Sequence, residues 1–276
     1  MKRVNGKQMK PTRKAGWLLG PVVVSYCPED SVDEALAQAR ALATAARVEV
    51  KSCTLDGAIS GNVAALAAAT GAGLIVLPGS LMDTVEGPRR LRAAMATARP
   101  VLLTRASFGG PVITVADAPR AGLGAMAVAA EEARRLDSPL LVVHAAEGIV
   151  GATKDDLGPV SAMSLRACLE TIRLRWGVTA ETRSIQGPWV SSLSSLAKEL
   201  KVRLIVLGAY DGSCTDDATR TQRMLEIASE APCSVLLLPQ PPEDGQWFAE
   251  RPNPAATLRR PRIADNAFIQ APGGIQ

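Results

Sequence analysis

Residues 48–79 read VEVKSCTLDGAISGNVAALAAATGAGLIVLPG, and residues 178–209 read VTAETRSIQGPWVSSLSSLAKELKVRLIVLGA. With an offset of 130, Gly57 matches Gly187, and the run LIVL at 74–77 matches LIVL at 204–207. Each copy predicts an alternating strand, a turn at a glycine, an amphipathic helix and then a fully apolar strand. The last feature is typical of a buried strand in a parallel sheet. The chain therefore contains an internal repeat.

The match continues on both sides of these stretches. VVVSY at 22–26 corresponds to LLVVH at 140–144, and RPVLLTR at 99–105 corresponds to CSVLLLP at 233–239. The second copy has one more strand and helix in front, beginning with PVITVAD at 111–117, for which the first copy shows no counterpart. Alternating strands and helices predict right-handed crossovers and a parallel sheet covered on both faces. We expect two α/β units in tandem, the first lacking its opening β-α.

These boundaries divide the chain into four parts. We expect a basic flexible tail over 1–16, a shortened unit over 17–107, a complete unit over 108–240 and a Pro-rich extended tail over 241–276. The last part contains apolar side chains that are costly to leave in water, namely Trp247, Phe248, Phe268 and Ile269. They are either incidental or the anchors of a segment that docks on the body, on another copy of the chain or on a protein partner.

Composition excludes several classes of function. The net charge of +4 comes from the first 14 residues, which contain six basic side chains and no acid, so a nucleic-acid-binding surface is not expected. No apolar run is long enough to span a membrane. The five cysteines are scattered, which suggests a reducing compartment and a cytoplasmic protein. With a single histidine, His144, no metal site is expected. The adjacent acids Glu131 and Glu132 are expected to be solvated.

Three runs in the second copy resemble the universal stress proteins. VITVADAP at 112–119 is similar to the family's first strand, VRLIVLGAYDG at 202–212 to its fourth strand, and IASEAPCSVLLLP at 227–239 to its last helix and strand. The resemblance implies a flavodoxin-like, Rossmann-like sheet in each unit, as in the adenine nucleotide α-hydrolase group. It also implies pairing of the units about a pseudo-twofold axis and a role in stress resistance without catalysis.

Members of the family that bind ATP or AMP have a glycine-rich phosphate loop, G-x2-G-x9-G-[S/T]. Glycines let the backbone approach the phosphates, and the amides of the next helix donate to them. Here the second glycine is replaced by Asp211, and three carboxylates occupy the loop, which disfavours a triphosphate. The acid that ends the first strand is present and serves either to recognise a nucleoside or to cap a helix. The resemblance thus implies a vestigial nucleotide site at Asp117, Gly208, Asp211, Gly212, Thr221 and Gln222.

Two functions follow as expectations, and a third is weaker. The first is a non-catalytic stress-type protein without a cofactor, which acts as a dimeric scaffold or accessory subunit. The alternative is a regulator that binds AMP or ATP in its second unit. The third is an enzyme of the wider adenine nucleotide α-hydrolase group. No nucleophile elbow or P-loop is present, so an enzyme is not expected.

Overall fold

The computed structural model describes residues 17–18, 20–27, 30–54, 60–106, 108–116, 122–145, 159–185, 188–208 and 217–239. The first unit contains, in chain order, β1 (Val22–Tyr26), α1 (Asp33–Ala46), β2 (Val50–Thr54), α2 (Ser60–Thr70), β3 (Leu74–Pro78), the short 3-10 helix η1 (Gly79–Asp83), α3 (Gly87–Met95) and β4 (Val101–Thr104). The second unit contains β5 (Val112–Val115), α4 (Gly122–Leu136), β6 (Leu140–Ala145), α5 (Pro159–Trp176), β7 (Ala180–Ile185), α6 (Trp189–Glu199), β8 (Leu204–Gly208), α7 (Asp217–Glu230) and β9 (Ser234–Leu238).

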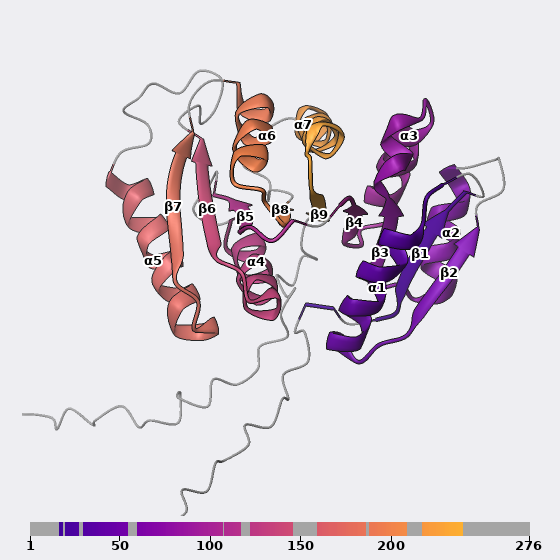
Figure 1. Ribbon diagram of the computed structural model, residues 1–276, viewed down its shortest axis with the longest axis horizontal. Coiled ribbons are helices and arrows are strands. Elements are labelled where there is room, and N and C mark those ends of the chain that lie inside the picture. Colours follow the sequence, from indigo (N-terminus) through magenta and orange to yellow (C-terminus); the bar gives the residue numbers. More distant parts are fainter. Residues whose placement is uncertain are drawn as a thin grey trace, which may run out of the picture.

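All nine strands that the structure describes form one sheet, in the order β2-β1-β3-β4-β9-β8-β5-β6-β7. Every neighbouring pair is parallel except β4 and β9, which are antiparallel. The units therefore lie side by side, and the sheet crosses from one to the other between β4 and β9 (Figure 1). The tandem α/β architecture that the repeat predicted is confirmed.

Helices cover both faces of this sheet. Apolar side chains of α1, α4 and α5 pack on one face, and those of α2, α3, α6 and α7 pack on the other. The strands nearest the junction are buried on both faces, which explains their uninterrupted apolar sequences. None of the helices in the described ranges combines the length and the apolar character that crossing a membrane requires.

The position at which the first unit is shorter differs from the expectation. β1 pairs with β3 through Val22 and Leu74, and β5 pairs with β8 through Val112 and Leu204 in the same register. α1 packs on β1 and β3 as α4 packs on β5 and β8. β1 and α1 therefore occupy the places of β5 and α4, the opening pair. What the described part of the first unit lacks is a counterpart of the outer pair, α5 and β7.

A local sequence match supports this correction. Gly20-Pro21-Val22 repeats Gly110-Pro111-Val112 at an offset of 90. Pro21 O accepts a hydrogen bond from Gly73 N, and Pro111 O accepts one from Arg203 N, both at 2.9 Å. The apolar run that follows fits either a first or a second strand, so hydrophobicity could not decide between them. The register decides, and the Gly-Pro-Val triplet agrees with it.

Candidate functional site

The carboxyl ends of the strands in the second unit are where the sequence predicted a vestigial nucleotide site. β8 ends at Gly208, which is half-buried and pairs with Leu238 of β9. Asp117, Asp211 and Gly212 lie outside the described residues, and Thr221 lies in α7. A nucleotide site at this edge therefore stays a prediction.

Gln222 is the other predicted site residue that the structure describes. Its side chain is exposed, its Nε2 donates to Glu226 Oε1 at 2.9 Å, and its Oε1 accepts from Nη2 of Arg92 at 2.7 Å. Arg92 belongs to α3 of the first unit, which packs against α7. The observed contacts of Gln222 thus connect the two units.

The equivalent strand ends of the first unit are filled by the chain itself. η1 follows β3 directly and buries Leu81, which is 2% exposed. A Cβ at Gly79 would stand 2.3 Å from Thr104 O, and one at Gly87 would stand 2.2 Å from Leu81 O. The missing side chain of Gly87 thus makes room for the backbone carbonyl of Leu81.

The position of Asp117 is also occupied differently in the first unit. The offset of 90 that aligns β1 with β5 places Cys27 where the second unit has Asp117. Cys27 is 2% exposed, and its backbone N–H donates to Asp30 Oδ2 at 2.6 Å. At this strand end the described carboxylate belongs to Asp30, three residues further on, and it accepts a hydrogen bond from the backbone of Cys27.

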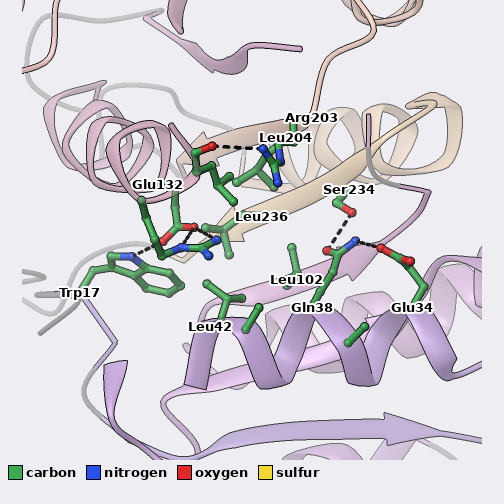
Figure 2. A pocket seen from close by; sticks show the side chains of 14 residues that line it. Trp17, Glu34, Gln38, Leu42, Leu102, Glu132, Arg203, Leu204, Ser234 and Leu236 are labelled. Carbon is green, nitrogen blue, oxygen red and sulfur yellow. Dashed lines mark hydrogen bonds and ion pairs between the residues drawn. The ribbon is translucent and has the colours of Figure 1, made fainter. Parts of the chain in front are cut away.

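A groove lies where the two units meet. α1 and α4 flank it, and β4 and β9 form its floor with Leu102 and Leu236 (Figure 2). Its volume is about 230 Å3. Leu42 of α1 extends the apolar floor, while polar side chains gather at both ends.

One end of the groove is formed by Trp17, Glu132 and Arg135. Trp17 Nε1 donates to Glu132 Oε1 at 3.2 Å, and Nη2 and Nε of Arg135 donate to Glu132 Oε2 at 2.6 and 2.9 Å. Trp17 and Glu132 are 2% and 1% exposed. Both oxygens of this buried carboxylate therefore accept hydrogen bonds, which offsets part of the cost of removing its charge from water.

The expectation that Glu131 and Glu132 are solvated is wrong. Glu131 is 7% exposed, and both acids lie within residues 125–133 of α4, all of which are buried. The sequence shows two adjacent acids in a helix, which is typical of a solvated face. Only the approach of Trp17, 115 residues away, makes the pair with Glu132 possible.

The other end of the groove is a polar network across the junction. Gln38 Nε2 donates to Glu34 Oε1 at 2.6 Å and to the carbonyl of Arg105 at 3.0 Å. Ser234 Oγ lies 3.0 Å from Gln38 Oε1 and accepts from Arg105 N at 2.9 Å. These bonds join α1, the end of β4 and the start of β9, and sequence reasoning had not identified any of them.

His144 is half-buried at the end of β6, opposite Ser184 of β7. In the described ranges, no cluster of three or more His, Cys, Asp or Glu side chains could hold a metal ion. The arrangement is suited to holding two units together and to binding an apolar group in the groove.

Comparison with known proteins identifies the fold. No protein-family model matches the chain, and no curated protein matches it in sequence. A solved protein of unknown function from Pseudomonas aeruginosa PAO1 is 16% identical, with a TM-score of 0.59, and the match covers 83% of this chain and 95% of that one. A provisionally named universal stress protein from Pseudomonas aeruginosa UCBPP-PA14 is also 16% identical with a TM-score of 0.59, covering 82% of this chain and 95% of that one. The chain has the fold of the universal stress proteins.

Proposed function

We propose that this chain is a non-catalytic stress-type protein that acts as a scaffold or accessory subunit, with two units permanently paired. The observation that carries the proposal is the continuous sheet through β4 and β9. A junction of this kind, in which matching strands of two related units pair antiparallel, is what a twofold dimer would use. In this chain the pairing is intramolecular, so the two units stay paired at any protein concentration.

The strand ends of the first unit are filled by the chain itself, which supports the proposal that no cofactor binds there. Buried Leu81 and the close backbone contacts of Gly79 and Gly87 leave no room for a phosphate loop. In the second unit, α7 begins at Asp217, so the chain supplies its own carboxylate at the helix end whose amides would bind a phosphate. Asp211 and Asp216 add two like charges to the same loop.

The alternative is a regulator that binds AMP or ATP in the second unit. The apolar strand β8 ending in Gly208, with Asp117 two residues beyond the end of β5, favours this alternative. A nucleoside monophosphate would bring less charge to the acidic loop than a triphosphate, so AMP is the better candidate.

A thermal shift with AMP and ATP, followed by isothermal titration, separates the two functions. A ligand present at about 100 times its dissociation constant stabilises the native protein by about 2.7 kcal/mol. We expect no shift of the melting midpoint at millimolar nucleotide. A rise of several degrees with either nucleotide that the variant Asp117→Asn abolishes would contradict the proposal and favour the regulator.

A scaffold must also present a contact surface, and we assign this role to the C-terminal tail. Trp247, Phe248, Phe268 and Ile269 lie outside the described residues, and they supply the aromatic and aliphatic anchors on which interfaces depend. We expect a chain that ends at Gln240 to keep the fold but to bind fewer proteins from its native host. Unchanged capture of those proteins and an unchanged elution volume would remove the tail from the proposal.

The cellular compartment is part of the same proposal. None of the cysteines in the described ranges forms a disulfide. This suits a reducing cytoplasm, and fractionation of the native host tests it.

A further inference from the structure

The groove between the units has room for one or two aromatic rings. Its volume of about 230 Å3 lies below the roughly 300–1,000 Å3 of ordinary small-molecule pockets. Apolar cavities of about 150 Å3 accept a benzene molecule. The floor formed by Leu42, Leu102 and Leu236 can therefore bury one or two aromatic rings, and the open side of the groove faces solvent between α1 and α4.

The groove is lined by two acids, Glu34 and Glu132, and by two arginines, and an acidic neighbour for that ring is favoured only away from the exposed Glu34. Arg203 lines the groove and donates to the carbonyl of Leu136 at 3.1 Å. Among the ion pairs in the described part of the chain, none includes Arg203. Arg135 precedes Leu136 in α4 and shares its charge with Glu132.

A segment with this chemistry follows β9 in the chain. Residues 241–251 read PPEDGQWFAER, so two aromatic side chains follow two acids, Glu243 and Asp244, after an interval of two residues. β9 contributes Leu236 to the floor of the groove and ends at Leu238. Trp247 is nine residues further, and an extended chain of that length reaches about 30 Å. The segment is therefore long enough to turn back over the groove.

The N-terminal segment is a poorer occupant, although it leads directly to Trp17. Residues 1–14 contain six basic side chains and no aromatic residue. They would bring positive charge to the end of the groove where Arg135 and Arg203 already lie.

We propose that Trp247 and Phe248 dock in this groove of their own chain, with Glu243 and Asp244 next to Arg203 and Arg135. Because the segment is tethered close to the groove, its effective concentration is in the millimolar range, and a weak contact suffices to keep it bound. Of the four apolar tail residues assigned above to protein partners, Phe268 and Ile269 then remain available, and Phe268 lies 20 residues beyond Phe248. Only this last assignment rests on the proposed scaffold function, and the docking itself stands independently of it.

Limited digestion of the full chain by chymotrypsin tests the docking, because the enzyme cuts after both Phe248 and Phe268. The two cleavage rates, measured by mass spectrometry of the released fragments, give a protected position and an internal reference. For an effective concentration about tenfold above the dissociation constant, cleavage after Phe248 slows about tenfold. The rates of both sites in urea-unfolded protein correct for the different neighbouring residues.

Two variants of α1 provide the matched comparison. Ala41 is exposed and lines the groove, whereas Thr44 is exposed on the same helix and does not line it. We expect Ala41→Glu to remove the protection of Phe248 and Thr44→Glu to keep it, with cleavage after Phe268 the same in all three proteins. Equal protection in Ala41→Glu, or none in the wild type, would overturn the proposal, as would protection that disappears on dilution, since it would come from a second copy. The nucleotide titrations and pull-downs described above do not depend on this result.

Discussion

Leu102 lies directly opposite Leu236 in the antiparallel pair of β4 and β9. The two residues hold the same place in their units, since RPVLLTR and CSVLLLP align with an offset of 134. On either side, Val101 pairs with Leu237 and Leu103 pairs with Val235, so each contact is repeated with the units exchanged. The pseudo-twofold axis therefore passes between Leu102 and Leu236, and the junction is of the self-complementary kind found in twofold dimers.

Truncation of either leucine at this axis should destabilise the whole chain. Leu102 and Leu236 are 3% and 2% exposed. We expect Leu102→Ala and Leu236→Ala each to lower the free energy of unfolding by about 2–5 kcal/mol, because a buried leucine loses contacts and leaves a cavity. Urea denaturation followed by circular dichroism measures this, and one common transition is expected because both units share the sheet.

The double variant tests whether the two leucines act as a pair. Residues in contact show non-additive effects of roughly 0.5–3 kcal/mol. Leu174→Ala is the control, since Leu174 is 72% exposed and its truncation should leave the transition in place. Strictly additive losses, or two separate transitions in the wild type, would show that the junction does not couple the units.

The buried carboxylate of Glu132 should contribute to stability through both of its donors, Trp17 and Arg135. Glu132→Gln keeps an acceptor for the indole but leaves the guanidinium of Arg135 without its charge partner, and we expect a loss of about 1–3 kcal/mol. Glu132→Ala also leaves the buried indole N–H without an acceptor, so its loss should be larger. Urea denaturation gives the order of the two variants.

The exposed pair of Glu170 and Arg173 is the matched control, because it has the same spacing and the same distance of 2.6 Å. The guanidinium of Arg173 lowers the pKa of Glu170, but both side chains are about half exposed. We expect Glu170→Gln to cause no measurable change in stability. A comparable loss at both sites would mean that burial of Glu132 adds nothing.

The sequence was sufficient to predict the strands and helices whose residue pattern occurs in both halves of the chain. The LIVL runs and the alternation of strands and helices gave the two-unit architecture, because hydrophobic periodicity reports burial directly. It was not sufficient to place β1, since VVVSY has the composition of any buried parallel strand. The register with β3 decides its position, and a register is a property of two segments, here 52 residues apart.

The groove was also beyond sequence reasoning. Its side chains come from Trp17, α1, α4 and the strands at the junction, and these residues are brought together only when β4 pairs with β9. Glu132 illustrates the difficulty, because the sequence alone does not distinguish a buried acid from a solvated one. The difference lies in the donors that the fold brings to its carboxylate. The predicted nucleotide residues, in contrast, followed from a resemblance to a family loop.

The repeated Gly-Pro-Val segment makes a prediction about backbone approach. A Cβ at Gly110 would stand 2.3 Å from Lys201 O and 2.4 Å from Leu200 O, both backbone atoms with little freedom to move. We expect Gly110→Ala to lower the free energy of unfolding by about 1–3 kcal/mol through this overlap. The neighbouring residue is the control: a Cβ at Gly109 would meet nothing within 4 Å, so Gly109→Ala should be neutral or stabilising by up to about 1 kcal/mol. Equal thermal midpoints for the two variants would contradict the close approach of this loop to the end of α6.

Burial of the Cys233 thiol should make stability depend on alkaline pH. Burial raises the pKa of Cys233 from 9.0 to about 12, although the charge of Arg105 acts in the opposite direction. Below pH 9 the thiol is neutral in both states, and its contribution to stability is fully present. Between pH 9 and 12 the unfolded chain loses this proton while the folded chain keeps it, so stability falls by up to about 1.4 kcal/mol per pH unit. The variant Cys233→Ala lacks this loss. At neutral pH its free energy of unfolding is lower than that of the wild type because of the cavity, and this difference should narrow as the pH rises from 9 to 11. A deficit that stays constant over this range in urea titrations would show that Cys233 ionises as readily in the folded protein as in the unfolded chain.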